Sequence, residues 1–220
     1  MAVPILIYCA SGNRRFAEIA LAAGFEYGAR LPGTVYFQLW FADQDWKKPD
    51  RKRYMTELAK HRPVMASVLD LETFEQLPEV LSWSEEAAQY VERVMIIPKA
   101  HGIISHLPRR IAGADVVLGY SVPTRYGGTE VASWEFAGWP VHLLGGSPHT
   151  QMGLAHYLNV VSADGNYHQL MASRYCEVWE NGKWFELNEL REHVDTDAIY
   201  AAFEMSCKNI VAAWGRLTLA

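Results

Sequence analysis

The stretch PVHLLGGSPHTQMGLAHYLNVVSAD, residues 140–164, decides the fold because it reads as strand, turn, helix and strand in one short segment. Residues 140–144 form an apolar run that Gly145 and Gly146 interrupt. Apolar side chains in 150–158 then recur at helical spacing, and 160–163 form a second apolar run that ends at Asp164. A helix between two buried strands predicts a parallel crossover, so both strands end at the same edge of a sheet.

The same alternation extends through most of the chain. Six further runs have the length and composition of strands, namely 3–8, 25–29, 34–41, 63–69, 93–97 and 115–120. Segments with helical spacing, 13–23, 50–61, 74–90 and 103–111, separate most of them. Eight strands separated mostly by helices predict an α/β fold, a (β/α)8 TIM-type barrel. An open doubly wound sheet, which needs fewer strands, is the alternative. A full helix is hard to see in 124–139.

The alternation stops after residue 174. Residues 176–187 predict a hairpin around Asn181-Gly182, the preferred pair for a two-residue turn, and 196–217 predict a terminal helix. No internal repeat or low-complexity linker interrupts the chain. We therefore expect one domain over 1–220, with the barrel over about 1–175 and the C-terminal hairpin and helix over about 176–220.

Composition narrows the class of protein. The chain has 220 residues, of which 50% are hydrophobic, and no apolar stretch long enough for a membrane span. Three separated cysteines and an N-terminus without a leader pattern indicate a cytoplasmic protein. A formal net charge of −5 argues against extensive contact with a polyanion. The exceptions are a basic run over 47–53 and Arg109-Arg110, for which solvation and phosphate binding are the two interpretations.

Barrel enzymes carry their active sites at the carboxyl ends of the strands, so the residues after each strand are the candidates. Polar and glycine residues gather there in this chain. A structural role is the alternative for several: Asp70 as a helix cap, Asp164 as a turn residue and Gly145-Gly146 as a tight turn. A lysine at the buried position of Lys99 has to reach a carboxylate, a phosphate or solvent. The candidates are Asp43, Asp45, Asp70, Lys99, Gly119, Tyr120, Glu130, Gly145, Gly146, Ser147, His149, Asp164 and Asn166.

Common ligand motifs are missing from the sequence. The eight histidines show no H-x-H or H-E-x-x-H spacing, so we expect no metal. No G-x-G-x-x-G, P-loop or G-x-S-x-G element occurs either. We therefore expect no cofactor.

The order of motifs in 63–174 resembles that of the tRNA-guanine transglycosylases. The run 141–149 followed by a helix and by 160–164 is similar to that family's "Leu-Met-Gly-Val-Gly-Thr-Pro" strand end, helix and nucleophile-bearing strand. Residues 65–72 resemble the strand whose aspartate binds the base, and 118–130 stand where the family has a glycine-rich turn and a glutamate. The pattern also resembles that of the phage and bacterial transglycosylase-like proteins that place 7-deazaguanines in DNA.

Several family features are absent. The chain has no Cys-x-Cys-x-x-Cys zinc site, and 41–45 occupies about the place of the family's Ser-Asp-Ser-Gly-Gly-Phe-Gln. Lys99 stands where the family has a base-contacting glutamine. The missing zinc site implies that the standard tRNA-docking subdomain is missing as well.

The resemblance implies a base-exchange reaction and assigns roles to the candidates. Asp164 would attack the anomeric carbon of a nucleotide, and Asp43 or Asp45 would handle the proton. Asp70 would bind the base, with Glu130 and the amides around Gly119 and Gly146 completing the pocket. Lys99 would bind the leaving base's carbonyl oxygen or a phosphate. The residue expected to stack on a base is Tyr120, Tyr126 or Trp46. The implied partners are DNA or tRNA and a purine-like base, with a partner protein as a further option and no membrane.

Three other interpretations remain open at this stage. Water could replace the incoming base, which would make the protein an N-glycosidase. The barrel could bind a nucleobase or a protein without catalysis. It could also be an unrelated lyase or isomerase with Lys99 as a Schiff-base amine.

Overall fold

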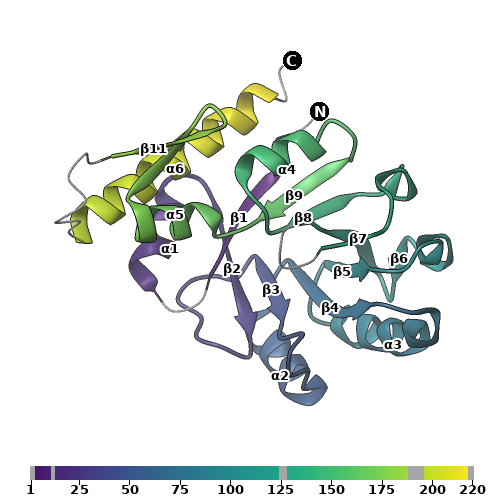
Figure 1. The fold of residues 1–220 in the computed structure, drawn as a ribbon. Coiled ribbons are helices and arrows are strands. Elements are labelled where there is room, and N and C mark those ends of the chain that lie inside the picture. The colour runs from purple at the N-terminus through teal and green to yellow at the C-terminus, as the bar shows by residue number, and fades with distance from the viewer. Residues whose placement is uncertain (1–2, 11–12, 124–127, 188–195, 218–220) are drawn as a thin grey trace.

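In a computed structural model that describes residues 3–10, 13–123, 128–187 and 196–217, eight parallel strands surround a central axis (Figure 1). Neighbouring strands pair in the order β5-β4-β3-β2-β1-β9-β8-β7, and a pairing between β5 and β7 closes the ring. The (β/α)8 TIM-type barrel is confirmed, and the open sheet is wrong. The strands of the ring are β1 (Ile5–Cys9), β2 (Glu26–Leu31), β3 (Phe41–Gln44), β4 (Met65–Leu71), β5 (Arg93–Pro98), β7 (Ala114–Ser121), β8 (Val141–Leu144) and β9 (Val160–Asp164).

The outer layer is uneven. Its helices are α1 (Arg14–Ala22), α2 (Arg51–His61), α3 (Leu77–Ala87), α4 (Pro148–Leu154) and α5 (Tyr167–Tyr175), with 3-10 turns η1 (Phe74–Gln76), η2 (Ile103–His106) and η3 (Ser133–Phe136). The predicted helix over 103–111 is wrong in its second half, because β6 (Arg110–Ile111) pairs antiparallel with β7. Only η3 is found in the described part of 124–139, in line with the missing helical pattern there.

The predicted strand over 34–41 is wrong except at its last residue, since β3 begins at Phe41. The segment before it packs as a loop: Tyr36 N–H donates to the Tyr27 hydroxyl at 3.3 Å, and the Phe37 ring meets Tyr27 edge-on. Leu39 is fully buried there. Aromatic and β-branched residues indicate that a segment is buried. Whether the segment forms a strand depends on a neighbouring strand to pair with, which the sequence pattern does not show.

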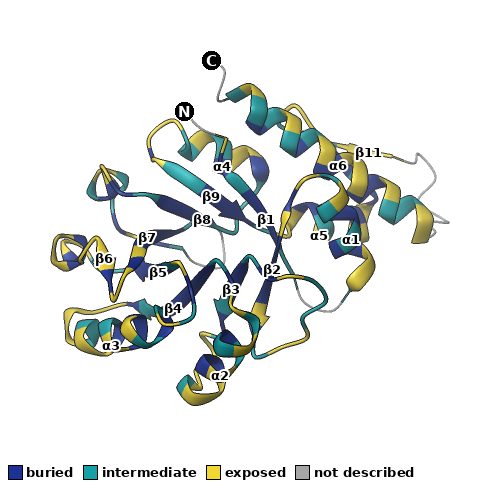
Figure 2. Cartoon of the chain, turned by 180° about the vertical axis from the view of Figure 1, so that it is seen from behind, coloured by how far each residue is buried: buried dark blue, intermediate teal, exposed yellow. Residues whose placement is uncertain are grey.

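The core has two parts on opposite sides of the strands. A large cluster fills the space between strands and helices, and Figure 2 shows the buried strands inside an exposed outer surface. A small cluster fills the barrel itself, formed by Ile7, Phe41, Met65, Met95, Ile97 and Val117. Toward the carboxyl ends of the strands the inward side chains become polar, with His142 and Ser162 fully buried. The barrel therefore has an apolar interior below a polar upper layer.

The C-terminal segment lies against one side of the barrel. β10 (Glu177–Glu180) and β11 (Lys183–Glu186) form the predicted antiparallel hairpin, and α6 (Thr196–Leu217) forms the predicted helix. α6 packs on α1, α5 and β10, and the Ser206 hydroxyl accepts a hydrogen bond from Trp179 N–H at 2.9 Å. No helix within the described residues is both long and apolar enough to cross a membrane.

His168 on α5 is sealed between the barrel and α6. Its ring stacks on Phe203 at 5.0 Å and on Phe25 at 5.6 Å, and its Nε2 has no hydrogen-bond partner among the described residues. Burial lowers the pKa of this imidazole to about 3. The folded protein consequently holds a neutral histidine under conditions in which the unfolded chain binds a proton.

We expect His168→Phe to remove part of the acid sensitivity of the fold. The pKa of His168 is lower in the folded protein than in the unfolded chain. Its contribution to the free energy of unfolding is therefore complete above about pH 6.5 and falls by about 1.4 kcal/mol per pH unit toward pH 3. Urea unfolding measures the free energy of unfolding at pH 7.5 and at pH 4.5. The decrease between these two pH values should be about 2 to 3 kcal/mol smaller in the variant than in the wild type. His156→Gln, at an exposed histidine, is the matched control. Equal losses in wild type and His168→Phe would contradict the assignment.

Candidate functional site

A cavity of about 760 Å³ opens at the carboxyl ends of the strands, where the sequence placed the site. Loops after β3, β4, β5, β7 and β8 contribute to it. Its volume is in the range of small-molecule and nucleotide sites. The residues that line it are Asp43, Gln44, Trp46, Ser67, Val68, Asp70, Glu72, Ile97, Lys99, Ser121, Val122, Gly128, Glu130, Leu144, Gly145 and Gly146.

Asp43 is the acid at the floor of this cavity. It follows Phe41 on the inward face of β3, because side chains alternate between the two faces of a strand. Its Oδ1 accepts a hydrogen bond from the Ser67 hydroxyl at 3.1 Å, and that hydroxyl accepts from Gln44 N–H at 2.7 Å. Burial, then the negative charge of Asp164, raises the pKa of Asp43 to about 7. This carboxyl group can therefore donate or accept a proton near neutral pH.

Asp164 lies just behind the cavity floor, at the end of β9. Gly145 N–H donates to its Oδ1 at 2.9 Å, and the negative charge of Asp164 is one cause, after burial, of the raised pKa of the Cys9 thiol. The side chain of Asp164 is 11% exposed, and Gly145 and Gly146 form the adjoining cavity wall. A backbone amide thus orients this carboxylate, and its charge acts on Asp43.

His142 lies near Asp164 inside the barrel. Its Nδ1 lies 2.8 Å from the Ser162 hydroxyl, and its Nε2 lies 3.8 Å from Asp164 Oδ1. That Nε2 is buried and has no hydrogen-bond partner in the described part of the chain. Because buried polar atoms normally find a partner, this nitrogen is available to Asp164 after a small movement of either side chain.

Asp70 enters the cavity because β4 contains a bulge. The register between β4 and β5 shifts between Ser67 and Asp70, so that Ser67 lies opposite Met95 and Asp70 opposite Ile97. An extra residue in one strand reverses the alternation beyond it and turns Asp70 inward. Lys99 Nζ then lies 3.7 Å from Asp70 Oδ2. Desolvation raises the pKa of Asp70, and the Lys99 charge opposes that rise.

The rim of the cavity combines an aromatic ring, an acid and two glycines. Trp46 is 63% exposed and lies under Lys47 Nζ, which is 5.2 Å from its ring centroid. Glu130 lines the opposite side, next to Thr129, whose hydroxyl donates to Pro98 O at 3.1 Å and so ties the β7 loop to β5. At Gly146 (φ +84°), a Cβ would lie 2.6 Å from Val122, so only glycine permits this approach.

Some predicted site residues lie elsewhere. Gly119 faces the barrel interior, where a Cβ would lie 2.7 Å from Ile97, and Tyr120 points outward onto Phe136. Asp45 lies in the turn after β3, with its carboxylate accepting from Lys47 N–H at 3.3 Å. None of these three lines the cavity. Tyr126 lies outside the described residues.

Three further candidates lie at the N-termini of helices α4 and α5, outside the cavity. Ser147 caps α4, with its hydroxyl accepting from Thr150 N–H at 3.2 Å. His149 is exposed and packs against Gly182 at the hairpin turn. Asn166 is the N-cap residue of α5 and is exposed. The structure thus brings together Asp43, Asp70, Lys99, Glu130, Gly145, Gly146 and Asp164, and leaves these three outside.

Sequence reasoning assigned no role at this site to Ser67 and His142. Both are polar residues within mostly apolar strands, which is the signal that would have revealed them. Arg30 was missed as well. It pairs in register with Asp43, and its charge lowers the pKa of that carboxyl against the larger effects of burial and Asp164.

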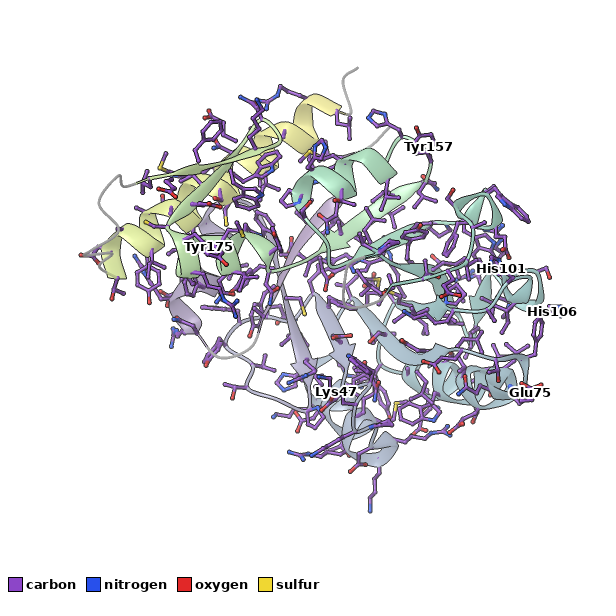
Figure 3. All side chains as sticks on the ribbon, viewed as in Figure 1. Lys47, Glu75, His101, His106, Tyr157 and Tyr175 are labelled. Carbon is purple, nitrogen blue, oxygen red and sulfur yellow. The ribbon has the colours of Figure 1, made fainter. Side chains whose placement is uncertain are left out.

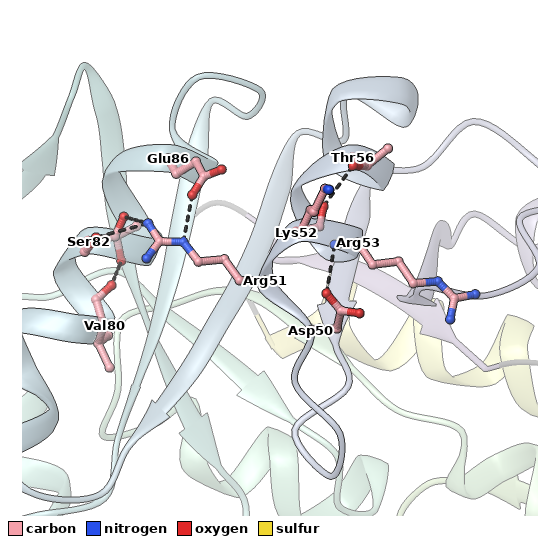
Figure 4. Close-up of polar contacts among 9 residues, drawn as sticks. Asp50, Arg51, Lys52, Arg53, Thr56, Val80, Ser82 and Glu86 are labelled. Carbon is pink, nitrogen blue, oxygen red and sulfur yellow. Dashed lines mark hydrogen bonds and ion pairs between the residues drawn. The ribbon is translucent and has the colours of Figure 1, made fainter.

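The basic run over 47–53 divides into Arg51, which is ion-paired, and several exposed side chains. Arg51 Nε lies 2.7 Å from Glu86 Oε2 and its Nη2 donates to Ser82, which ties α2 to α3 (Figure 4). Asp50 caps α2 through Arg53 N–H. Lys47, Lys48, Lys52 and Arg53 are exposed, and Figure 3 places Lys47 at the margin of the barrel. Within the described residues no group of three His, Cys, Asp or Glu side chains is placed to hold a metal.

Residues 20–215 match the model of a family of unknown function, DUF6610. The chain belongs to this family. No curated protein matches the sequence of this DUF6610 member. Among solved structures, it is similar to a monomeric form of phosphoribosylanthranilate isomerase from Thermotoga maritima. The identity is 12% and the TM-score 0.38, over 94% of this chain and 98% of the other.

Proposed function

We propose that this DUF6610 protein exchanges the base of a nucleotide or nucleic acid through a covalent glycosyl-enzyme, with Asp164 as nucleophile and Asp43 as acid and base. The observation that carries the proposal is the carboxyl pair formed by Asp43 at the cavity floor and Asp164 just behind it. Burial beside Asp164 raises the pKa of Asp43 to about 7. Glycosidic bond cleavage requires a carboxylate at the anomeric carbon and a second carboxyl group that can donate a proton to the leaving group.

The reaction proceeds in two balanced steps. Asp164 attacks the anomeric carbon, the bond between that carbon and the base nitrogen breaks, and the electron pair leaves with the base. Asp43 donates its proton to the departing nitrogen. An incoming base then loses a proton to Asp43 and attacks the same carbon, which breaks the ester bond and restores Asp164. If water takes the place of the incoming base, the same steps give hydrolysis.

The remaining cavity residues are suited to a purine-like base. Asp70 and Glu130 accept hydrogen bonds from ring or exocyclic N–H groups, and Lys99 donates to a carbonyl oxygen. The exposed Trp46 ring offers a stacking surface at the rim, where a base taken out of its helix arrives first. A nucleotide turned out of its helix, with its base and sugar both in the cavity, would also have its anomeric carbon close to Asp164.

The Schiff-base alternative is disfavoured by the position of Lys99. Its amine lies 3.7 Å from a carboxylate, in an ion pair that competes with its use as a free nucleophile. Borohydride trapping of Lys99 with a carbonyl substrate would reverse this preference. The incorporation assay described below distinguishes the enzyme from a barrel that binds a base without catalysis.

The proposal predicts incorporation of labelled guanine into a polymer. Wild-type protein is incubated with labelled guanine and, in separate reactions, duplex DNA, tRNA or a free nucleotide, and label in the recovered substrate is counted. Incorporation into one of them is the expected result, and the labelled substrate identifies the acceptor class. Release of base without incorporation would indicate the hydrolytic form.

A second labelled base, 7-deazaguanine, is run in parallel because the incoming base is not specified by the cavity. Absence of exchange and of base release with both bases and all three substrates, together with measurable binding of a base, would contradict the enzyme proposal. It would support the binding module instead.

A further inference from the structure

A second large cavity lies at the opposite, amino-terminal end of the barrel. It has a volume of about 600 Å³, and the proposed reaction does not use it. Its floor is apolar, and Arg93, Arg109, Arg110 and Asp115 stand around it. Because β5 alone rises about 17 Å from its first to its last residue, this cavity is separated from the acidic one by the length of the barrel.

Arg109 is held in a defined orientation at this cavity. Its guanidinium lies 3.5 Å from the centroid of the Trp139 ring, and its Nη1 donates to Gly138 O at 2.8 Å. No carboxylate among the described residues forms an ion pair with it. A guanidinium stacked on an indole keeps its remaining N–H groups in one plane, which is the geometry that binds carboxylate and phosphate oxygens.

Arg93 is the second cation of the cavity without a carboxylate partner in the described part of the chain. It starts β5, and its guanidinium lies 5.9 Å from the Trp40 ring centroid. Arg110, by contrast, is paired: its Nε lies 3.1 Å from Asp115 Oδ1. Positive charge therefore exceeds negative charge at this mouth, although the whole chain carries a formal net charge of −5.

The floor between these arginines is built for an apolar group. Val117 belongs to the cluster that fills the barrel, and Ile5 and Val161 pack against that cluster. Pro140 and Val160 extend the apolar lining. A fully hydrated inorganic ion would leave this surface exposed to water. A ligand with an apolar body and an anionic end would cover the floor and neutralise the guanidinium groups together.

We propose that the amino-terminal mouth of the barrel is a binding site for a small organic anion, a carboxylate or phosphate monoester on an apolar body. Arg93 and Arg109 bind the anionic oxygens, and the floor of Ile5, Val117 and Val161 covers the apolar body. Apart from Asp115, which is ion-paired, no side chain that lines this cavity is a candidate acid, base or nucleophile. The site therefore binds its ligand without chemical change.

The experiment measures binding of phenyl phosphate by titration calorimetry at low and moderate salt. We expect saturable binding to the wild type that weakens with salt, with phenol and inorganic phosphate each binding more weakly than phenyl phosphate. The substitutions Arg93→Gln and Arg109→Gln should each weaken binding by about tenfold. Arg53→Gln, at an exposed arginine on α2 distant from this mouth, is the matched control and should bind as the wild type does.

Two outcomes would overturn the proposal. Equal affinity for phenol and phenyl phosphate, or unchanged affinity in both arginine variants, would show that the guanidinium groups do not bind the anion. Loss of binding in Lys99→Gln, with both arginine variants unaffected, would place the ligand in the acidic cavity instead. Because base exchange is not measured here, failure of this proposal and failure of the proposed function are distinguishable.

Discussion

Asp164→Asn is expected to abolish base exchange, with a loss of about 10⁴-fold or more in the rate of the chemical step. The amide retains the hydrogen bond from Gly145 N–H to Oδ1, so the geometry of the floor is preserved. It lacks the charge and the nucleophilicity that the attack on the anomeric carbon requires. Wild-type protein mixed with nucleic acid in a single turnover should yield a covalent protein–nucleic acid species on a denaturing gel, and the variant should yield none.

The same substitution has a second, independent readout. Because the charge of Asp164 is the largest electrostatic cause of the raised pKa of Asp43 after burial, Asp164→Asn should lower that pKa. A carboxyl carbon resonance of Asp43 followed by NMR against pH measures it. Asp197→Asn, an exposed acid in the first turn of α6, is the matched control for both readouts. Full exchange activity in Asp164→Asn would remove it from the mechanism.

Asp43→Asn is expected to lose activity and gain stability. Exchange should fall by about 10²- to 10⁴-fold, because the leaving base no longer receives a proton. The folded-state pKa of about 7 lies above the unfolded value, so the wild type loses stability as pH rises from about 4 to 7. At pH 8 the neutral amide avoids this cost, and the variant should be more stable by an amount on the order of 4 kcal/mol.

The protonation of Asp43 also determines how the rate of adduct formation by the wild type changes with pH. Adduct formation needs protonated Asp43, so its rate should decline as pH rises through about 7, and Asp43→Asn should lack that decline. Urea unfolding and single-turnover rates across pH 5.5 to 8.5 measure both effects. A variant that is inactive but no more stable at pH 8 would indicate a structural role for Asp43 in place of a titrating one.

The architecture was largely predictable because it depends on local patterns. Apolar runs of strand length alternating with amphipathic helices identify a barrel, and the Asn181-Gly182 turn identifies the hairpin. The errors lie at 34–41 and 103–111, where composition typical of strand or helix belongs to a packed loop and to the short antiparallel β6. Whether these two segments form strands or helices depends on which neighbouring strands are available for pairing, and the local sequence pattern does not give that information.

By itself the sequence determined which end of the barrel carries the acids, because polar residues follow the strands at their carboxyl ends. Only the tertiary structure decided which of them meet. The β4 bulge turns Asp70 inward, and the register of β7 turns Tyr120 outward. The pKa of Asp43 likewise depends on Asp164, far away in the chain. Side-chain direction reverses with every residue of register, and electrostatic coupling depends on distance in space, so neither follows from the order of residues alone.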